Sequence, residues 1–348
     1  MRMKKLVLIA TGCQVVLSFF LTDANATYQL LITNRQYLNG GVQAALDPVA
    51  DQIQTNFDTT MAAADQTGFL AQVGDANAGA SRSYLAPGVY GEARYLFGFG
   101  ISAALAGGTS FSAPANSLPA VGAAAQSGFN LAANGEIIHI FMGLDPKRVM
   151  YHASFNSMNL SSLIGHGVTL HSLQASAGVS YQMSNPFMWM PGILYNGVRL
   201  STGASYGNFS GSYTTPYTLS SGGINMTTNA TLAVDSSVFS VTGEATTGFR
   251  FFWLMDLYTG AAIDLNVGST SLSGSTSNGA VSATQGGVTV FTGDAAVSGS
   301  GTSAAPVIAD LRWLLGTQVN LGPLGIYAQL QVGSPSVYSL NLGGHLVF

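Results

Sequence analysis

Apolar and polar residues alternate with a period of two along most of the chain. In the segment 324–332, Leu324, Ile326 and Leu330 share one face, whereas Gln329 and Gln331 lie on the other. Such alternation indicates a strand with one apolar and one polar face. It recurs at 88–97, 147–157, 168–182, 190–206, 238–252, 257–267, 305–315 and 337–348, and less regularly at 67–75, 99–107 and 135–143. The pattern predicts roughly twelve strands of about 9–15 residues, long enough to cross a membrane at a tilt.

The connections between these segments alternate in length. Short turns are expected at 145–147, 184–187, 254–256 and 319–323, and longer connections at 108–134, 158–167, 207–237 and 272–304. A membrane barrel with short periplasmic turns and long extracellular loops has this arrangement. The longest connection, 272–304, is rich in Gly, Ser and Thr but contains the apolar sequence VTVF. It is therefore either a surface loop or an extra hairpin above the membrane.

The C-terminal segment VYSLNLGGHLVF places Tyr338, Leu346 and Phe348 on one face. An amphipathic last strand that ends in Phe, with an aromatic residue near its start, resembles the assembly signal of Gram-negative outer-membrane β-barrels. The resemblance implies an all-β fold, a transmembrane antiparallel β-barrel in the cell outer membrane. It also implies outer-membrane lipid and the barrel-assembly machinery as partners, the machinery recognising these three residues. A secreted β-sandwich that happens to end in Phe is the competing interpretation.

Residues 1–26 have the features of a secretory signal peptide. Basic residues near the start precede an apolar stretch, and Ala24-Asn25-Ala26 offers a small-residue cleavage site. The single cysteine, Cys13, lies in this segment, so we expect neither disulfides nor thiolate metal sites in the mature chain. The sequence around Cys13 loosely matches a lipoprotein cleavage box, but the apolar stretch continues beyond it.

Residues 42–65 break the strand alternation. Val49, Ile53, Phe57 and Met61 recur every four positions and predict one apolar stripe of an amphipathic helix. This helix belongs to a periplasmic or lumenal segment, residues 27–66, that precedes a barrel at residues 67–348. No basic residue accompanies the stripe, which disfavours binding to anionic lipid headgroups. We expect the helix to pack on protein: in the lumen as a plug, across the periplasmic mouth as a cap, or between subunits of a homo-oligomer.

Composition excludes several classes of protein. Only 7% of the residues are charged, yet no uncharged apolar stretch after the N-terminus reaches the roughly 18 residues that a spanning helix needs. The 18 Phe and 14 Tyr residues argue against disorder, which favours few aromatics. A formal net charge of −4 argues against a nucleic-acid partner.

Ten ionisable residues of the predicted strands fall on the polar face, which in a membrane barrel faces the lumen. They are Glu92, Arg94, Arg148, His152, Arg199, Glu244, Arg250, Asp264, Asp310 and Arg312. An arginine facing lipid at mid-membrane would cost about 2–4 kcal/mol, so this consistency supports the strand assignment.

Two functions fit these lumenal charges. Opposed cationic and acidic walls would make a porin-like passive channel for small hydrophilic solutes. Alternatively the charges pair in a dry network, and the protein is a non-conducting oligomeric or lipid-organising barrel in which the N-terminal helix plugs the lumen or mediates assembly.

The histidines offer little support for catalysis. His166 and His171 lie near each other, but no G-x-S-x-G motif accompanies them and no carboxylate is close in sequence. We therefore expect no enzymatic activity, no cofactor and no metal.

Overall fold

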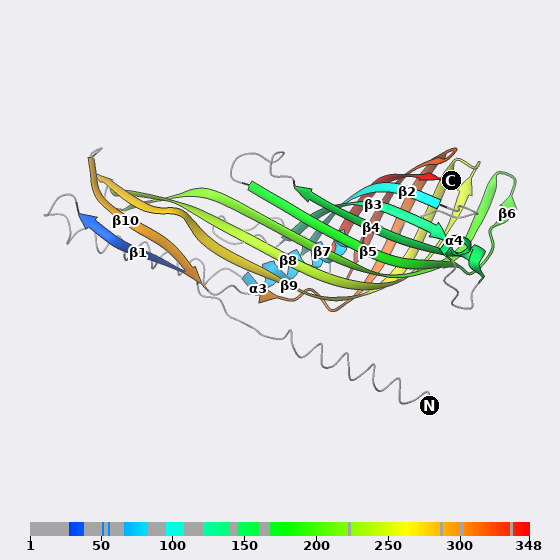
Figure 1. The fold of residues 1–348 in the computed structure, drawn as a ribbon, viewed down its shortest axis with the longest axis horizontal. Helices are drawn as coiled ribbons and strands as arrows, with labels where there is room; N and C mark the ends of the chain where they lie inside the picture. Colours follow the sequence, from blue (N-terminus) through cyan, green and yellow to red (C-terminus); the bar gives the residue numbers. More distant parts are fainter. Residues whose placement is uncertain are drawn as a thin grey trace, which may run out of the picture.

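In the computed structural model, ten antiparallel strands close into a barrel (Figure 1). The structure describes residues 28–37, 51, 55, 66–82, 95–107, 121–138, 145–159, 168–221, 224–285, 288–299, 303–334 and 337–348. The barrel strands are β2 (Tyr95–Gly107), β3 (Val121–Asn134), β4 (Val149–Asn159), β5 (Val168–Gln182), β7 (Ile193–Ser221), β8 (Ile224–Phe251), β9 (Met255–Gln285), β12 (Ala309–Leu321), β13 (Leu324–Gly333) and β14 (Val337–Val347). The barrel closes where β14 pairs with β2.

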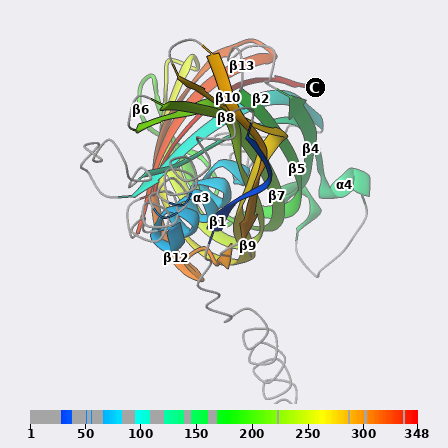
Figure 2. The ribbon, with the colours of Figure 1, turned by 90° about the vertical axis from the view of Figure 1, so that its left-hand side faces the viewer.

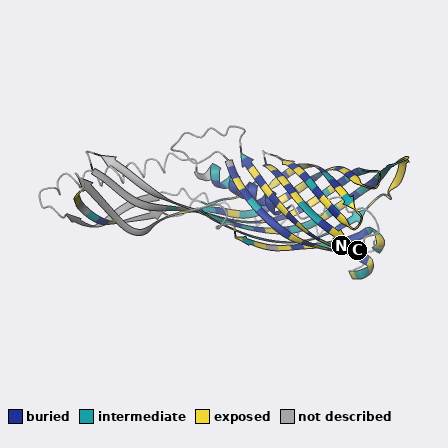
Figure 3. Cartoon of the chain, turned by 90° about the horizontal axis from the view of Figure 1, so that it is seen from above, coloured by how far each residue is buried: buried dark blue, intermediate teal, exposed yellow. Residues whose placement is uncertain are grey.

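Side chains alternate between the two faces of the barrel wall, which gives the chequered burial pattern of Figure 3. Along β2, β12 and β13 nearly every second residue is buried and its neighbours are exposed. The exposed residues are large and apolar, for example Phe99, Trp313 and Leu340, whereas polar residues such as Gln329 and Asn341 face inward. A wall that is apolar outside and polar inside is suited to lipid. The predicted antiparallel transmembrane barrel is therefore confirmed as a fold.

The predicted number of twelve strands is wrong. Segments 88–97 and 99–107 meet in a single strand, β2, which begins at Tyr95 among the described residues. Residues 135–138 form a short helix, α4 (Gly135–Ile138), and the strand of this region lies earlier, at β3. Alanine and glycine occur on both faces of β3, so the sequence alternation there is too weak to reveal a strand.

The segment 67–75 was predicted as a strand but lies in helix α3 (Gln66–Ser81). The helix stripe predicted at 42–65, with Val49, Ile53, Phe57 and Met61, lies outside the described residues. In the same N-terminal segment, residues 27–66, a strand, β1 (Tyr28–Tyr37), precedes the predicted helix. Among the described helices, none has both the length and the apolarity needed to cross a membrane.

Three strands continue far beyond the barrel. The strands β7, β8 and β9 contain 29, 28 and 31 residues, whereas about 9–11 residues cross a membrane. At about 3.3 Å per residue, each is roughly 90–100 Å long. The segments 207–237 and 272–304, expected to be long connections, are largely strands. Their Gly, Ser and Thr residues lack the apolar face that reveals a strand within the membrane.

Two further strands enlarge this extension. The strand β10 (Val288–Gly299) pairs with β9, and β1 pairs with β10 (Figure 1). An extra hairpin was one of the two alternatives for 272–304, and it is the one observed. Two short strands complete the sheet: β11 (Ser303–Ala304) pairs with β9, and β6 (Phe187–Met190) pairs with β7.

The C-terminal residue belongs to the closing seam of the barrel. The backbone N–H of Phe348 donates to the carbonyl of Tyr95 at 3.0 Å, and the Tyr95 N–H donates to the Phe348 carbonyl at 3.2 Å. On the same outer face, Tyr338 and Leu346 are exposed. We predict that deleting Phe348 leaves export intact but strongly reduces insertion, measured as the heat-modifiable fraction in outer-membrane extracts, because unpaired backbone groups are costly in lipid.

A second variant separates the contribution of the aromatic ring to insertion from that of the backbone hydrogen bonds. Phe348→Ala keeps both hydrogen bonds but loses the aromatic ring. If the ring is the assembly signal, Phe348→Ala and the deletion should be similarly defective, while Phe348→Tyr should insert normally. Normal insertion of both the deletion and Phe348→Ala would contradict the predicted signal.

Candidate functional site

Helix α3 lies inside the barrel. Figure 2, viewed from the end that carries β1 and β10, shows it within the ring of strands. It contacts β2, β3, β7, β8, β9 and β14, which lie on different sides of the lumen. Leu70, Ala76, Asn77 and Ala78 are each 0% exposed. A helix buried all round needs no polar face, and this one contains mainly Gly, Ala and small polar residues.

Small residues on the helix and on the wall allow their close approach. A Cβ atom at Gly79 would lie 2.8 Å from Cγ1 of Val337 and 3.3 Å from Cβ of Ala104. A Cβ atom at Gly122, on β3, would overlap the helix backbone at Gln72 and Val73. A larger residue at Gly122 would therefore require the helix to move.

Two polar side chains attach the helix to the wall. The amide of Asn77 donates to the carbonyls of Gly207 and Ser236 at 3.1 and 3.2 Å, and its oxygen accepts from Nε2 of Gln126 at 2.6 Å. The carboxylate of Asp75 accepts from the backbone N–H of Val307 at 2.6 Å. These bonds connect one turn of the helix to β3, β7, β8 and the segment before β12.

A buried ionic network lies where the helix ends. Arg82 donates through Nη1 to Asp264 at 2.8 Å and to Asp310 at 3.3 Å, and through Nη2 to Asn266 at 2.7 Å. On the other side, Arg312 donates through Nε to Asp264 at 2.9 Å. Both guanidinium groups are almost fully buried. The residue after the helix is therefore held by carboxylates of β9 and β12.

Further ion pairs and hydrogen bonds lie in the interior. Arg312 also contacts Glu244 at 3.4 Å, which brings β8 into the network. Nearer the short turns, Arg250 binds Asp256 through two bonds of 2.9 and 3.0 Å. Asn320 donates to the same carboxylate at 2.6 Å. Charges at both levels of the lumen are thus paired with each other.

Most residues predicted to face the lumen do lie on the inner face. Buried there are Arg199, Asp264, Asp310 and Arg312; His152, Glu244 and Arg250 are partly buried, and Arg148 lies at the rim beside Asp145. Glu92 and Arg94 lie outside the described residues. Whether any of these residues lines a pore remains a prediction.

Sequence analysis missed Asp75, Asn77 and Arg82. Because the alternation at 67–75 predicts a strand of the wall, the sequence pattern indicates no lumenal partner for Asp264 in this region. The sequence does contain one signal for this helix: residues 66–82 are rich in Ala and Gly and include only two charged residues, Asp75 and Arg82. In the part of the chain that the structure describes, no group of three His, Cys, Asp or Glu residues is placed to bind a metal.

A family model described as Lsa36-like matches residues 25–348, and the chain belongs to the Lsa36-like family. No curated protein matches the sequence. Several solved structures of outer-membrane proteins match the chain at low identity. The translocator domain of the autotransporter NalP from Neisseria meningitidis is 10% identical with a TM-score of 0.34, over 88% of this chain and 98% of that one.

Two other barrels show a similarly loose likeness. A major outer membrane protein from Thermus thermophilus is 12% identical with a TM-score of 0.29, over 73% of this chain and 99% of that one. Ail from Yersinia pestis is 12% identical with a TM-score of 0.25, over 74% and 100%. Superpositions this loose carry no argument about function. The closed barrel and its apolar outer face identify the chain as an outer-membrane β-barrel, as its last strand predicted.

The buried network should contribute strongly to stability. We predict that Arg82→Ala lowers the free energy of unfolding by about 3–5 kcal/mol, because Asp310 loses the cation that balances it. Arg148→Ala is the matched control: its ion pair with Asp145 is 3.4 Å long and largely exposed, so about 0–1 kcal/mol is expected. Urea unfolding in vesicles measures both. Equal losses for the two variants would contradict the assigned role of Arg82.

The carboxyl of Asp75 should make stability depend on pH. Burial raises its pKa from 3.8 to about 6, and the hydrogen bond from Val307 only partly opposes this. The folded protein therefore binds this proton more tightly than the unfolded chain, so the group destabilises the fold above pH 6, and the effect fades as the pH falls toward the unfolded value.

Asp75→Asn removes this dependence but keeps an oxygen that can accept from Val307. We predict that the variant is more stable than the parent chain by about 2–3 kcal/mol at pH 8, with a difference near zero around pH 4. Urea titrations across this range measure the difference between the two proteins, which cancels the other titrating groups. A difference that does not change with pH would contradict the prediction.

Proposed function

We propose that the protein is a non-conducting outer-membrane barrel, sealed by α3, whose working part is the sheet that β1 and β7–β10 form beyond the membrane. The observation that carries the proposal is the burial of the lumen-facing side chains. Gln126 is 1% exposed, Asp264 0% and Arg312 2%. Side chains that line a water-filled pore would be exposed to that water.

The alternative of a porin-like passive channel needs accessible charges on opposed walls. Here the charges of β8, β9 and β12 pair with each other and with Arg82. A ten-stranded barrel is wider than the eight-stranded barrels that side chains alone can fill. The helix supplies the extra volume, which favours the paired network over the open pore.

The length of the strands favours a role outside the membrane. The short turns and the C-terminus lie at one end of the barrel, which is the periplasmic end in barrels of this class. The long sheet leaves from the opposite end and is therefore extracellular. Its last strand, β1, pairs only with β10 among the described strands, so its other edge offers backbone groups to a binding partner. Homo-oligomerisation, recognition by the assembly machinery and the absence of catalysis remain predictions.

Planar-bilayer recording tests the seal. We expect the full chain to show no stepwise conductance and a variant lacking residues 27–82 to show discrete steps, because removal of α3 leaves a wide polar lumen. The heat-modifiable gel shift must confirm that both barrels are folded. Steady conductance steps from the folded full chain would reject the sealed barrel and restore the passive channel.

A further inference from the structure

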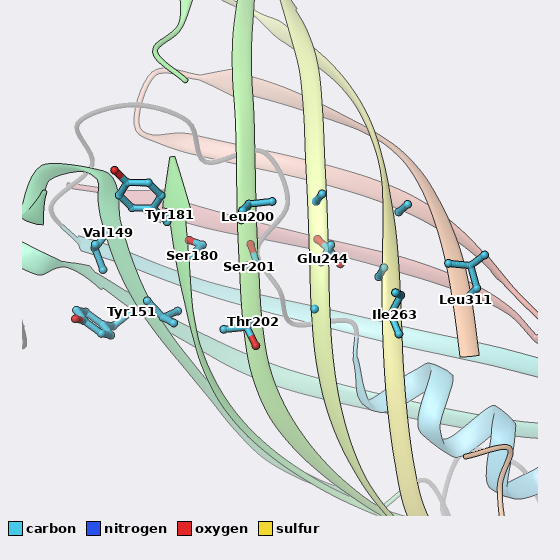
Figure 4. A pocket seen from close by; sticks show the side chains of 15 residues that line it. Val149, Tyr151, Ser180, Tyr181, Leu200, Ser201, Thr202, Glu244, Ile263 and Leu311 are labelled. Carbon is cyan, nitrogen blue, oxygen red and sulfur yellow. The ribbon is translucent and has the colours of Figure 1, made fainter. Parts of the chain in front are cut away.

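The outer face of the barrel is hollowed on one side. A groove of about 650 Å³ crosses β4, β5, β7, β8, β9 and β12 (Figure 4). Cross-strand partners in antiparallel strands lie on the same face. Thr202 pairs with Gly243, Gly243 with Ile263, and Ile263 with Leu311. Because Ile263 and Leu311 are at least half exposed, this row of side chains faces outward, toward lipid.

Small residues form the floor of the groove, and larger ones form its ends. Gly243 and Ala245 lie on β8 in the middle, with Tyr181 toward one end and Leu311 at the other. A Cβ atom built on Gly243 would meet nothing within 4 Å. Glycine weakens a strand, and within a strand it often marks a place where a ligand approaches the backbone. This hollow must be filled by an apolar group when the barrel is in a membrane.

Basic residues stand at one end of the groove. Lys147 and Arg148 lie in a short 3-10 helix, η1 (Pro146–Arg148), that directly precedes Val149, a residue of the groove wall. They line a hollow of about 510 Å³ at the rim of the barrel, where the next cation, Arg199, lies on the inner face. The carboxylate of Asp145 contacts Arg148 at 3.4 Å, and Lys147 is exposed beside this pair.

We propose that this groove binds an acyl chain of an anionic phospholipid of the periplasmic leaflet, with the phosphate held by Lys147 and Arg148. From β4 to β12 the groove spans five strand intervals of about 4.8 Å, or roughly 24 Å. It begins at the basic rim beside the short turns and rises obliquely toward the middle of the wall. An apolar groove that ends beside basic residues matches a lipid with an anionic head. The choice of leaflet rests on the proposed orientation, in which the short turns are periplasmic.

Native mass spectrometry of the folded full chain tests the headgroup. The protein is released from vesicles containing equal amounts of phosphatidylglycerol and phosphatidylcholine with matched chains. We expect retention of one phosphatidylglycerol with a preference of about tenfold, since each basic residue near the surface favours an anionic lipid. Lys147→Ala combined with Arg148→Ala should remove the preference, whereas Lys147→Arg should keep it.

Filling the groove tests the acyl-chain site. The side chain added by Gly243→Leu would occupy the open space of the groove, so this variant should retain phosphatidylglycerol at least severalfold less. Ala103→Leu adds the same side chain to the outer face of β2, outside the groove, and should leave retention unchanged. Equal retention of the two lipids by the parent chain, or unchanged retention by Gly243→Leu, would overturn the proposal. If the parent chain forms a dimer and Gly243→Leu abolishes that dimer, the groove binds a second copy of the chain, and the lipid proposal is overturned as well.

Discussion

Polar side chains that cannot face lipid must find partners inside the barrel, and the rest of the structure depends on this constraint. Lipid reverses the usual arrangement, so the charges of β8, β9 and β12 point into the lumen. There Asp264 is paired with Arg312 of the wall, but Asp310 would be buried and unbalanced without a cation from elsewhere in the chain. Arg82 supplies one from the end of α3. The same ion pairs therefore neutralise the wall and hold the helix in place.

The composition of α3 follows from its position. A helix surrounded by wall on all sides has no solvent face, so it lacks the amphipathic stripe of a surface helix. Its glycines and alanines let the backbone approach β2 and β14, and Gly122 on the adjoining strand β3 allows the same close approach. Asn77 then satisfies backbone carbonyls of β7 and β8 that face the lumen. Small size and a few directed polar groups together make the helix fit this lumen.

Periodicity predicted the elements whose two faces differ in chemistry. The strand β5 has the predicted bounds, 168–182, and the inward positions of Asp264 and Arg312 follow from parity alone. Periodicity did not predict two kinds of element. The sheet beyond the membrane is rich in Gly, Ser and Thr, which weaken its alternation, and α3 covers a segment, 67–75, where Gly and Ala gave only a blurred alternation. The pairing of Arg82 with Asp264, 182 residues apart in sequence, has no local signal.

The most direct test of the account is a disulfide between α3 and the wall. The hydroxyl oxygens of Ser81 and Ser205 lie 3.5 Å apart, and both residues are buried, so Ser81→Cys with Ser205→Cys changes little except the reactivity. The natural Cys13 lies in the predicted signal peptide. On non-reducing gels, the folded pair should cross-link nearly completely, while Ser81→Cys with Ala204→Cys, whose second thiol faces lipid, should not. A folded barrel in which Ser81→Cys and Ser205→Cys stay reduced under oxidation would show that α3 does not occupy the lumen.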